Sequence, residues 1–165
     1  MYDEMQRLCL RQNAIHHVDS LSSLGATLKE LDLYDNLIAH IKGLEELKIL
    51  TSLDFSFNKI KTIKRVDHLK ELKDIYFVQN KISKIEGLEG LLNLRNLELA
   101  ANRIKDIENI SSLKSLEELW LGKNKISEIT ASSFKQSLSS CMTDRLLRTY
   151  TASPISGLSP SNPTV

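Results

Sequence analysis

Acidic and aromatic residues recur at a fixed interval of 22 residues along this 165-residue chain. The series consists of Asp32, Asp54, Tyr76, Glu98 and Trp120, and each member lies between two apolar residues. Carboxylates attract basic side chains, and tyrosine and tryptophan are the side chains that most often dominate the binding energy of protein interfaces. The chemistry of this series is therefore that of binding a protein that presents basic groups around apolar pockets. The alternative is an ordinary solvated surface, on which acidic residues are common.

Candidate catalytic and metal-binding residues do not occur at the spacings that those functions need. His16, His17, His40 and His68 lack a second ligand at a metal-binding spacing. No serine lies in a nucleophile-elbow sequence, and the glycines of the segment 87–90 do not form a phosphate-loop pattern. We expect no catalytic residue, no metal and no cofactor, and hence a protein that is not an enzyme.

Asparagines mark an internal repeat with the same period as the acidic and aromatic series. They are Asn13, Asn36, Asn58, Asn80, Asn102 and Asn124, which are 22 residues apart except for a first interval of 23. Apolar residues keep the same offsets around each asparagine, and one unit reads Leu50, Leu53, Phe55, Asn58, Ile60, Ile63, Val66, Leu69. A short period with this L-x-L-x-x-N core is the signature of leucine-rich repeats. The sequence therefore predicts about six such repeats.

The repeat pattern predicts the geometry of each unit. Alternation in the L-x-L element indicates a strand with its leucines facing the interior, and the later I-x-x-I spacing indicates a tight return. The asparagine follows the strand, where its amide can satisfy buried backbone groups, so stacked repeats would form an asparagine ladder. The predicted fold class is α/β, a leucine-rich-repeat solenoid with a parallel concave sheet and short 3₁₀ or irregular convex returns.

The concave sheet is expected to carry the acidic and aromatic series on its outer surface. Neighbouring outward-facing positions add the acids Glu30, Asp35, Asp74 and Glu118 and the bases Arg7, Arg11 and Lys123. Counted together, these columns hold seven acids and three bases, so we predict an acidic face with aromatic side chains set into it. A second column, just after the asparagines, contains Lys59, Lys81, Arg103 and Lys125. This column is either a solvated edge or a flanking contact for an acidic patch.

The repeat predicts a single solenoid domain over residues 1–130. After Ile129 the register calls for apolar residues, but Ser132 and Lys135 stand there. Residues 131–147 carry apolar side chains at helical spacing, and two alternatives remain open: a capping helix and a segment without a fixed fold. Residues 148–165 are rich in serine, threonine and proline and are predicted to be a disordered tail.

Composition narrows the class of partner. A formal net charge of +1 argues against a dominant role in nucleic-acid binding. The chain has no run of apolar residues long enough to span a membrane and no basic, apolar start typical of a signal peptide. Cys9 and Cys141 lie too far apart in the sequence to suggest a disulfide framework, which favours a reducing compartment. We expect a monomer that binds another protein.

Several stretches resemble the leucine-rich-repeat regulatory subunits of type-1 serine/threonine protein phosphatase (the regulatory subunit 7 family). They are Leu31–Asn36, Leu53–Asn58, Asn80–Glu86, Asn102–Lys105 and Leu121–Ile126, within a similarity over about residues 8–129. The resemblance implies a non-catalytic regulator in the nucleus and cytoplasm whose concave face docks the phosphatase catalytic subunit. It also implies that Asp54, Tyr76, Glu98 and Trp120 match the docking positions of that family.

The repeat array is shorter than those of the family it resembles. Six strands offer a face of about 400 Å², whereas a stable interface buries about 800 Å² on each partner. We therefore expect weakened phosphatase binding, or none that is stable. The alternative function is that of a leucine-rich-repeat structural adaptor, such as a ciliary or ribonucleoprotein scaffold.

Overall fold

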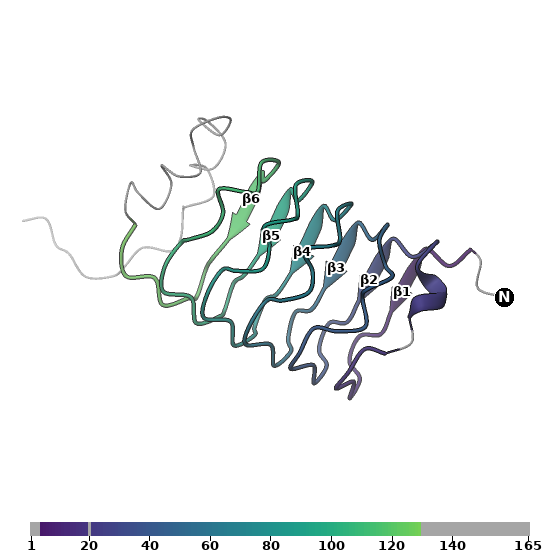
Figure 1. The fold of residues 1–165 in the computed structure, drawn as a ribbon. Helices are drawn as coiled ribbons and strands as arrows, with labels where there is room; N and C mark the ends of the chain where they lie inside the picture. The colour runs from purple at the N-terminus through teal and green to yellow at the C-terminus, as the bar shows by residue number, and fades with distance from the viewer. Residues whose placement is uncertain (1–3, 20, 130–165) are drawn as a thin grey trace, which may run out of the picture.

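The computed structural model describes residues 4–19 and 21–129, which form a stack of short parallel strands (Figure 1). The strands are β1 (Arg7–Cys9), β2 (Glu30–Asp32), β3 (Ser52–Asp54), β4 (Asp74–Tyr76), β5 (Asn96–Glu98) and β6 (Glu118–Trp120). They pair in chain order in one six-stranded sheet, and each leucine or isoleucine at a strand centre lies opposite the equivalent residue of the next repeat. Residues that share a place in the repeat therefore share a column in the fold. The predicted leucine-rich-repeat solenoid is confirmed.

The interior of the solenoid is built from the apolar positions of the repeat. Leu53, Phe55, Ile60 and Ile63 of one unit are fully buried, and their equivalents in neighbouring repeats are buried as well. The rings of Phe55 and Phe77 stack on each other with centroids 5.9 Å apart and planes inclined by 6°. Because each repeat is only one chain thick, these contacts between neighbours supply the burial that a single repeat cannot provide alone.

The returns cover one face of the sheet, and no other element of residues 4–19 and 21–129 covers the opposite face (Figure 1). One 3₁₀ helix, η1 (Ser22–Leu24), lies in the first return. In the next return, the backbone N–H of Leu47 donates to the carbonyl of Leu44 at 3.0 Å, and that of Leu50 donates to Leu47 at 3.2 Å. Such bonds between residues three apart are of the 3₁₀ type. The part of the chain that the structure describes contains no α-helix, so the helical component of the fold class consists of these turns.

Two further sequence predictions concern segments beyond this core. The capping helix at 131–147 and the disordered tail at 148–165 both lie outside the described residues. None of the helices within residues 4–19 and 21–129 has the length and apolar character needed to cross a membrane.

The repeated asparagines connect each repeat to the one before it. The Nδ2 group of Asn58 donates to the carbonyls of Phe55 (3.1 Å) and Ser56 (3.2 Å) in its own repeat and of Leu33 (2.9 Å) in the preceding one. Its Oδ1 accepts a hydrogen bond from the backbone N–H of Ile38 at 2.9 Å. Each amide thus satisfies backbone groups that would otherwise be buried without a partner.

The same arrangement recurs along the stack. Asn36, Asn80 and Asn102 are buried and make equivalent bonds, and the half-buried Asn124 also reaches the preceding repeat through Leu99 and Ile104. Asn13 is exposed in the first repeat, and its amide donates only to the nearby carbonyls of Leu10 and Arg11.

Replacing Asn80 with alanine should destabilise the fold by about 1–3 kcal/mol. The substitution leaves the buried N–H of Ile60 without its acceptor, which costs about 1–3 kcal/mol, whereas the carbonyl of Phe55 keeps the hydrogen bond from Asn58. Urea unfolding followed by circular dichroism measures the loss. Asn13→Ala is the matched control and should cost less than about 1 kcal/mol, because Asn13 is exposed. Equal losses in the two variants would contradict this account.

Candidate functional site: the concave face

The acidic and aromatic series forms one row across the uncovered face of the sheet. Asp32 pairs in register with Asp54, Asp54 with Tyr76, Tyr76 with Glu98, and Glu98 with Trp120. We call these five residues the concave row. The first four are half-buried, whereas 44% of Trp120 is exposed on β6. Because neighbouring strands lie about 4.8 Å apart, the row presents five side chains of binding chemistry within about 20 Å.

Arginines neutralise the acids at the β1 end of the face. Arg7 Nε lies 2.6 Å from Glu30 Oε2, and Arg11 Nε donates to Asp32 Oδ2. The second guanidinium nitrogen of Arg11 also lies 4.0 Å from Asp54. These groups line a hollow of about 420 Å³ over β1 to β4. The acidic excess that the residue count predicted is therefore concentrated toward β3 to β6.

These ion pairs do not follow from a count of charges in the columns of the repeat. The signal was present in the spacing, because Arg7 precedes Glu30 by 23 residues and Arg11 precedes Asp32 by 21, close to one repeat. Counting charges by column treats every residue as independent and so misses pairs between neighbouring repeats.

The acids between β3 and β5 are poorly solvated. Burial raises the pKa of Asp54 and of Asp74, and burial together with the charge of Asp54 raises the pKa of Glu98. The pKa of Tyr76 is raised as well, chiefly by burial and then by the charge of Asp74. A raised carboxyl pKa means that burial penalises the ionised form more than its neighbours stabilise it in the free protein. A cationic group placed over this part of the face would stabilise the ionised form.

Short polar contacts orient the side chains of the concave row. Trp120 Nε1 donates to Glu118 Oε2 at 3.1 Å, and the Asn96 amide donates to the Tyr76 hydroxyl at 3.5 Å. Asp54 Oδ1 accepts from the backbone N–H of Ser56 at 2.7 Å. Oriented side chains lose less conformational freedom when a partner binds, which favours binding by this surface.

A second aromatic group lies beside the row and was not singled out by sequence analysis. The rings of Tyr34 and Phe57 are 4.8 Å apart, and the Arg11 guanidinium lies 5.3 Å from the centre of the Tyr34 ring. Phe57 is 40% exposed. The signal for this group was the occurrence of two aromatics in adjacent repeats just after the L-x-L element. It adds an apolar contact to the rim of the concave face.

The histidines and Cys9 were the other candidates for a metal-binding or catalytic role. Within the described ranges, no cluster of three or more histidine, cysteine or acidic residues could hold a metal ion. His68 Nε2 is 3.0 Å from the carbonyl of Leu44 and so contributes to a contact between returns. Cys9 is exposed and has a free thiol.

Comparison with known proteins supports the repeat and the family resemblance. The family model described as leucine rich repeats (2 copies) matches residues 92–135. The chain is 52% identical over 49 residues to protein phosphatase 1 regulatory subunit SDS22 of Schizosaccharomyces pombe, covering 30% of this chain and 14% of that protein. It is 47% identical over 58 residues to the Saccharomyces cerevisiae protein of the same name, covering 34% of this chain and 17% of that protein. The matched segments thus span less than a fifth of the relatives' length.

Solved structures show the same architecture. An internalin of Listeria monocytogenes str. 4b F2365 superposes with a TM-score of 0.67 at 30% identity, covering 73% of this chain and 35% of that one. A leucine-rich-repeat protein of Leptospira interrogans superposes with a TM-score of 0.70 at 29% identity, covering 84% of this chain and 36% of that one. Together these comparisons confirm the solenoid and the resemblance to phosphatase regulatory subunits.

Replacing Asp54 with asparagine should leave the stability at pH 7 equal or higher. The amide oxygen can still accept from Ser56 N–H, while a poorly solvated charge is removed. Because the folded-state pKa of Asp54 is raised, the folded protein binds the proton more tightly, and wild-type stability falls as pH rises between the unfolded and folded pKa values. The advantage of the variant should therefore vanish at pH values below both. Thermal unfolding at pH 3 and pH 7 measures the difference.

Asp106→Asn provides the control, because Asp106 is exposed in the return after β5. Its replacement should change the unfolding midpoint little at either pH. A clear loss of stability in Asp54→Asn at pH 7 would show that Asp54 is stabilised by its neighbours and would contradict the description of an under-solvated face.

Proposed function

We propose that this chain is a non-catalytic protein-binding subunit that docks the catalytic subunit of protein phosphatase 1 on its concave row. The observation that carries the proposal is the alignment of alternating acidic and aromatic side chains in one register across an uncovered sheet. The relatives of similar sequence are named as regulatory subunits of this phosphatase, which supports the choice of partner. By the same resemblance we place the complex in the nucleus and cytoplasm.

Electrostatics and burial favour a basic partner over β3 to β6. In this part of the face Asp54, Asp74 and Glu98 have raised pKa values because burial penalises their charge. A lysine or arginine of the partner would stabilise the ionised carboxylates, and this gain is specific to a cationic ligand. The β1 end is already paired with arginines and would contribute less.

The two aromatics of the concave row are placed to supply most of the binding energy. Trp120 is 44% exposed and Tyr76 is half-buried, so a partner can cover both. Truncation of a tyrosine or tryptophan in the centre of an interface commonly costs about 2 kcal/mol or more. Because the described face is small compared with the roughly 800 Å² of a stable interface, we expect a weak complex that depends strongly on these two residues.

The double variant Tyr76→Ala/Trp120→Ala should weaken binding to the isolated phosphatase catalytic subunit by at least about thirtyfold, because two anchoring contacts are lost. Biolayer interferometry with the full chain immobilised gives the dissociation constants. Leu92→Ala is the matched control: Leu92 is a large apolar side chain that is 57% exposed on a return, outside the concave row. It should bind as the wild type does.

Each contrary outcome has a distinct meaning. Undiminished binding by the double variant would contradict docking on the concave row. Absence of binding by the wild type would contradict the phosphatase partnership and favour the structural-adaptor function. A loss in Leu92→Ala equal to that of the double variant would point to the returns as the interface.

A further inference from the structure

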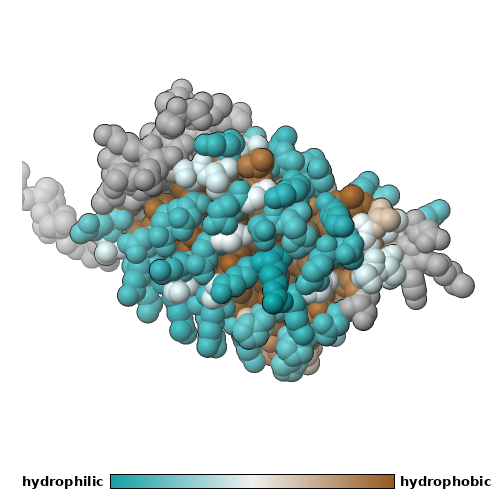
Figure 2. Space-filling model, viewed as in Figure 1, coloured by the Kyte–Doolittle hydropathy of each residue, from teal (hydrophilic) through white to brown (hydrophobic). Residues whose placement is uncertain are grey.

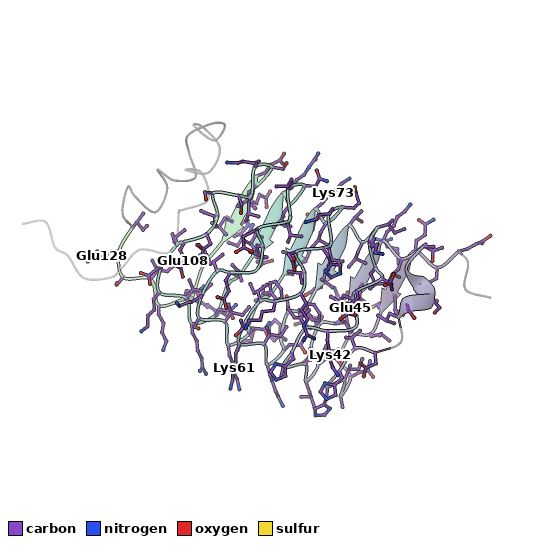
Figure 3. The ribbon with its side chains drawn as sticks, viewed as in Figure 1. Lys42, Glu45, Lys61, Lys73, Glu108 and Glu128 are labelled. Atoms are coloured by element: carbon purple, nitrogen blue, oxygen red, sulfur yellow. The ribbon has the colours of Figure 1, made fainter. Side chains whose placement is uncertain are left out.

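A second depression lies among the returns and shares no residue with the concave row. It has a volume of about 460 Å³ and is lined by His17, His40, Lys42, Thr62, Lys64 and Arg65. These residues follow β1, β2 and β3, so three successive repeats contribute to it. Figure 3 shows Lys42 on this side of the solenoid, and the face seen in Figure 2 is mostly hydrophilic. We call this depression the basic groove.

The basic groove carries an excess of positive charge. Lys42 is 3.5 Å from Asp19, an acid whose side chain is 66% exposed. Neither Lys64 nor Arg65 forms an ion pair with any residue that the structure describes. Three cations against Asp19 and the nearby Glu45 leave a local charge of about +1, which favours an anionic ligand such as a phosphate monoester.

The second of these acids, Glu45, approaches the groove without neutralising it. The pKa of Glu45 is lowered, first by its own backbone N–H and to a smaller extent by the charge of Arg65. Glu45 accepts a hydrogen bond from the backbone N–H of Gly43 at 3.3 Å and makes no ion pair within the described ranges. The guanidinium of Arg65 therefore remains available to a ligand.

The φ angle of Arg65 indicates that the arginine is not required for the conformation of the turn. Arg65 has a φ of 60°, in the left-handed region, and the equivalent positions of the other returns hold Gly43 (φ 77°), Gly87 (φ 71°) and Asn109 (φ 57°). Glycine adopts this conformation without steric cost, and asparagine tolerates it better than other residues. Asn109 also donates to the carbonyl of Ile85 at 2.8 Å, a contact between repeats. Arginine is the least suited of these residues to the conformation.

Backbone strain retained in a cluster of side chains of one chemical character is a feature of binding sites. We propose that the basic groove binds a phosphate monoester carried by a serine or threonine of another polypeptide. The planar guanidinium of Arg65 can donate two parallel hydrogen bonds to phosphate oxygens, and Lys42 and Lys64 supply further charge. The hydroxyl of Thr62 and the imidazoles of His17 and His40 add donors. The groove is larger than a phosphate group, so it has room for part of the residue that bears it.

Titration of the full 165-residue chain with three probes tests this site: a phosphoserine peptide with uncharged flanking residues, the same peptide without phosphate, and orthophosphate. In two-dimensional NMR spectra, the phosphopeptide should shift the amide signals of residues 17, 40 and 62–65, and the unmodified peptide should not. Weaker binding of orthophosphate than of the phosphopeptide would support a peptide-borne ligand. Equal binding would support the phosphate site and assign the free anion as its ligand.

Arg65→Gly separates binding from folding, because glycine is the residue that two other returns use at this position. The variant should keep or raise the thermal unfolding midpoint. It should bind the phosphopeptide at least about tenfold more weakly than the wild type does. Lys114→Ala, which removes the same charge from an exposed site in the return before β6, should bind as the wild type does.

Three results would overturn the proposal. The first is the absence of shifts at residues 17, 40 and 62–65 with the phosphopeptide. The second is wild-type affinity in Arg65→Gly, and the third is an equal loss in Lys114→Ala. The third result would show that only the general charge of the protein attracts the peptide.

Discussion

The hydrogen bonds from each repeated asparagine to the backbone of the preceding repeat are the constraint on which the rest of the structure depends. Asn58 contacts Leu33 and Ile38 of the repeat before it, and its own strand end, with a single amide. These bonds are directional, whereas the contacts among aliphatic side chains are not. Burial therefore drives the stacking of repeats, while the asparagines, together with the backbone hydrogen bonds between neighbouring repeats, determine how far one repeat is displaced along the next. A different displacement would leave buried carbonyls without donors.

A fixed displacement between repeats determines which residues are neighbours on the surface of the sheet. Because every strand pairs in the same register, residues one period apart must lie next to each other on the sheet. This geometry concentrates charge as well as aromatic area: burial first, and then the charge of at least one neighbouring acid, disfavours the ionised forms of Asp54, Asp74 and Glu98. The face is thus suited to a cationic partner because it is poorly satisfied without one, and the fold tolerates this because the stability comes from the interior.

Much of the fold follows from the sequence because the period alone determines which residues become neighbours. The strand positions, the buried leucines and the order of the sheet follow from the offsets around the asparagines. The ion pair of Arg11 with Asp32 does not, because it joins two different columns, whereas Arg7 and Glu30 are partners within one column. The contact between Tyr34 and Phe57 has the same origin. A periodic sequence therefore predicts columns well and predicts diagonal contacts between columns poorly.

Positions with a positive φ angle favour glycine. Where another residue occupies such a position, its side chain is the feature to explain. Each repeat passes through the left-handed region just before its asparagine, where residues as different as Gln79, Ala101 and Lys123 are found. At these positions the backbone conformation does not select one type of side chain. The contacts that the side chain makes then decide which residue is found there.

The repeat that contains β3 and the return after it holds two such residues. Phe57 lies beside the concave row, and Arg65 lies in the basic groove, on the return that follows the same strand. Both accept a backbone conformation that glycine would adopt more easily, and both expose their side chains to solvent. Neither residue is buried in the core, and the aromatic contact of Phe57 is with the ring of Tyr34 at the surface. The third repeat therefore holds two residues, Phe57 and Arg65, that the backbone conformation does not require. Phe57 lies beside the concave row and Arg65 lies in the basic groove, so this single repeat contributes to both surfaces.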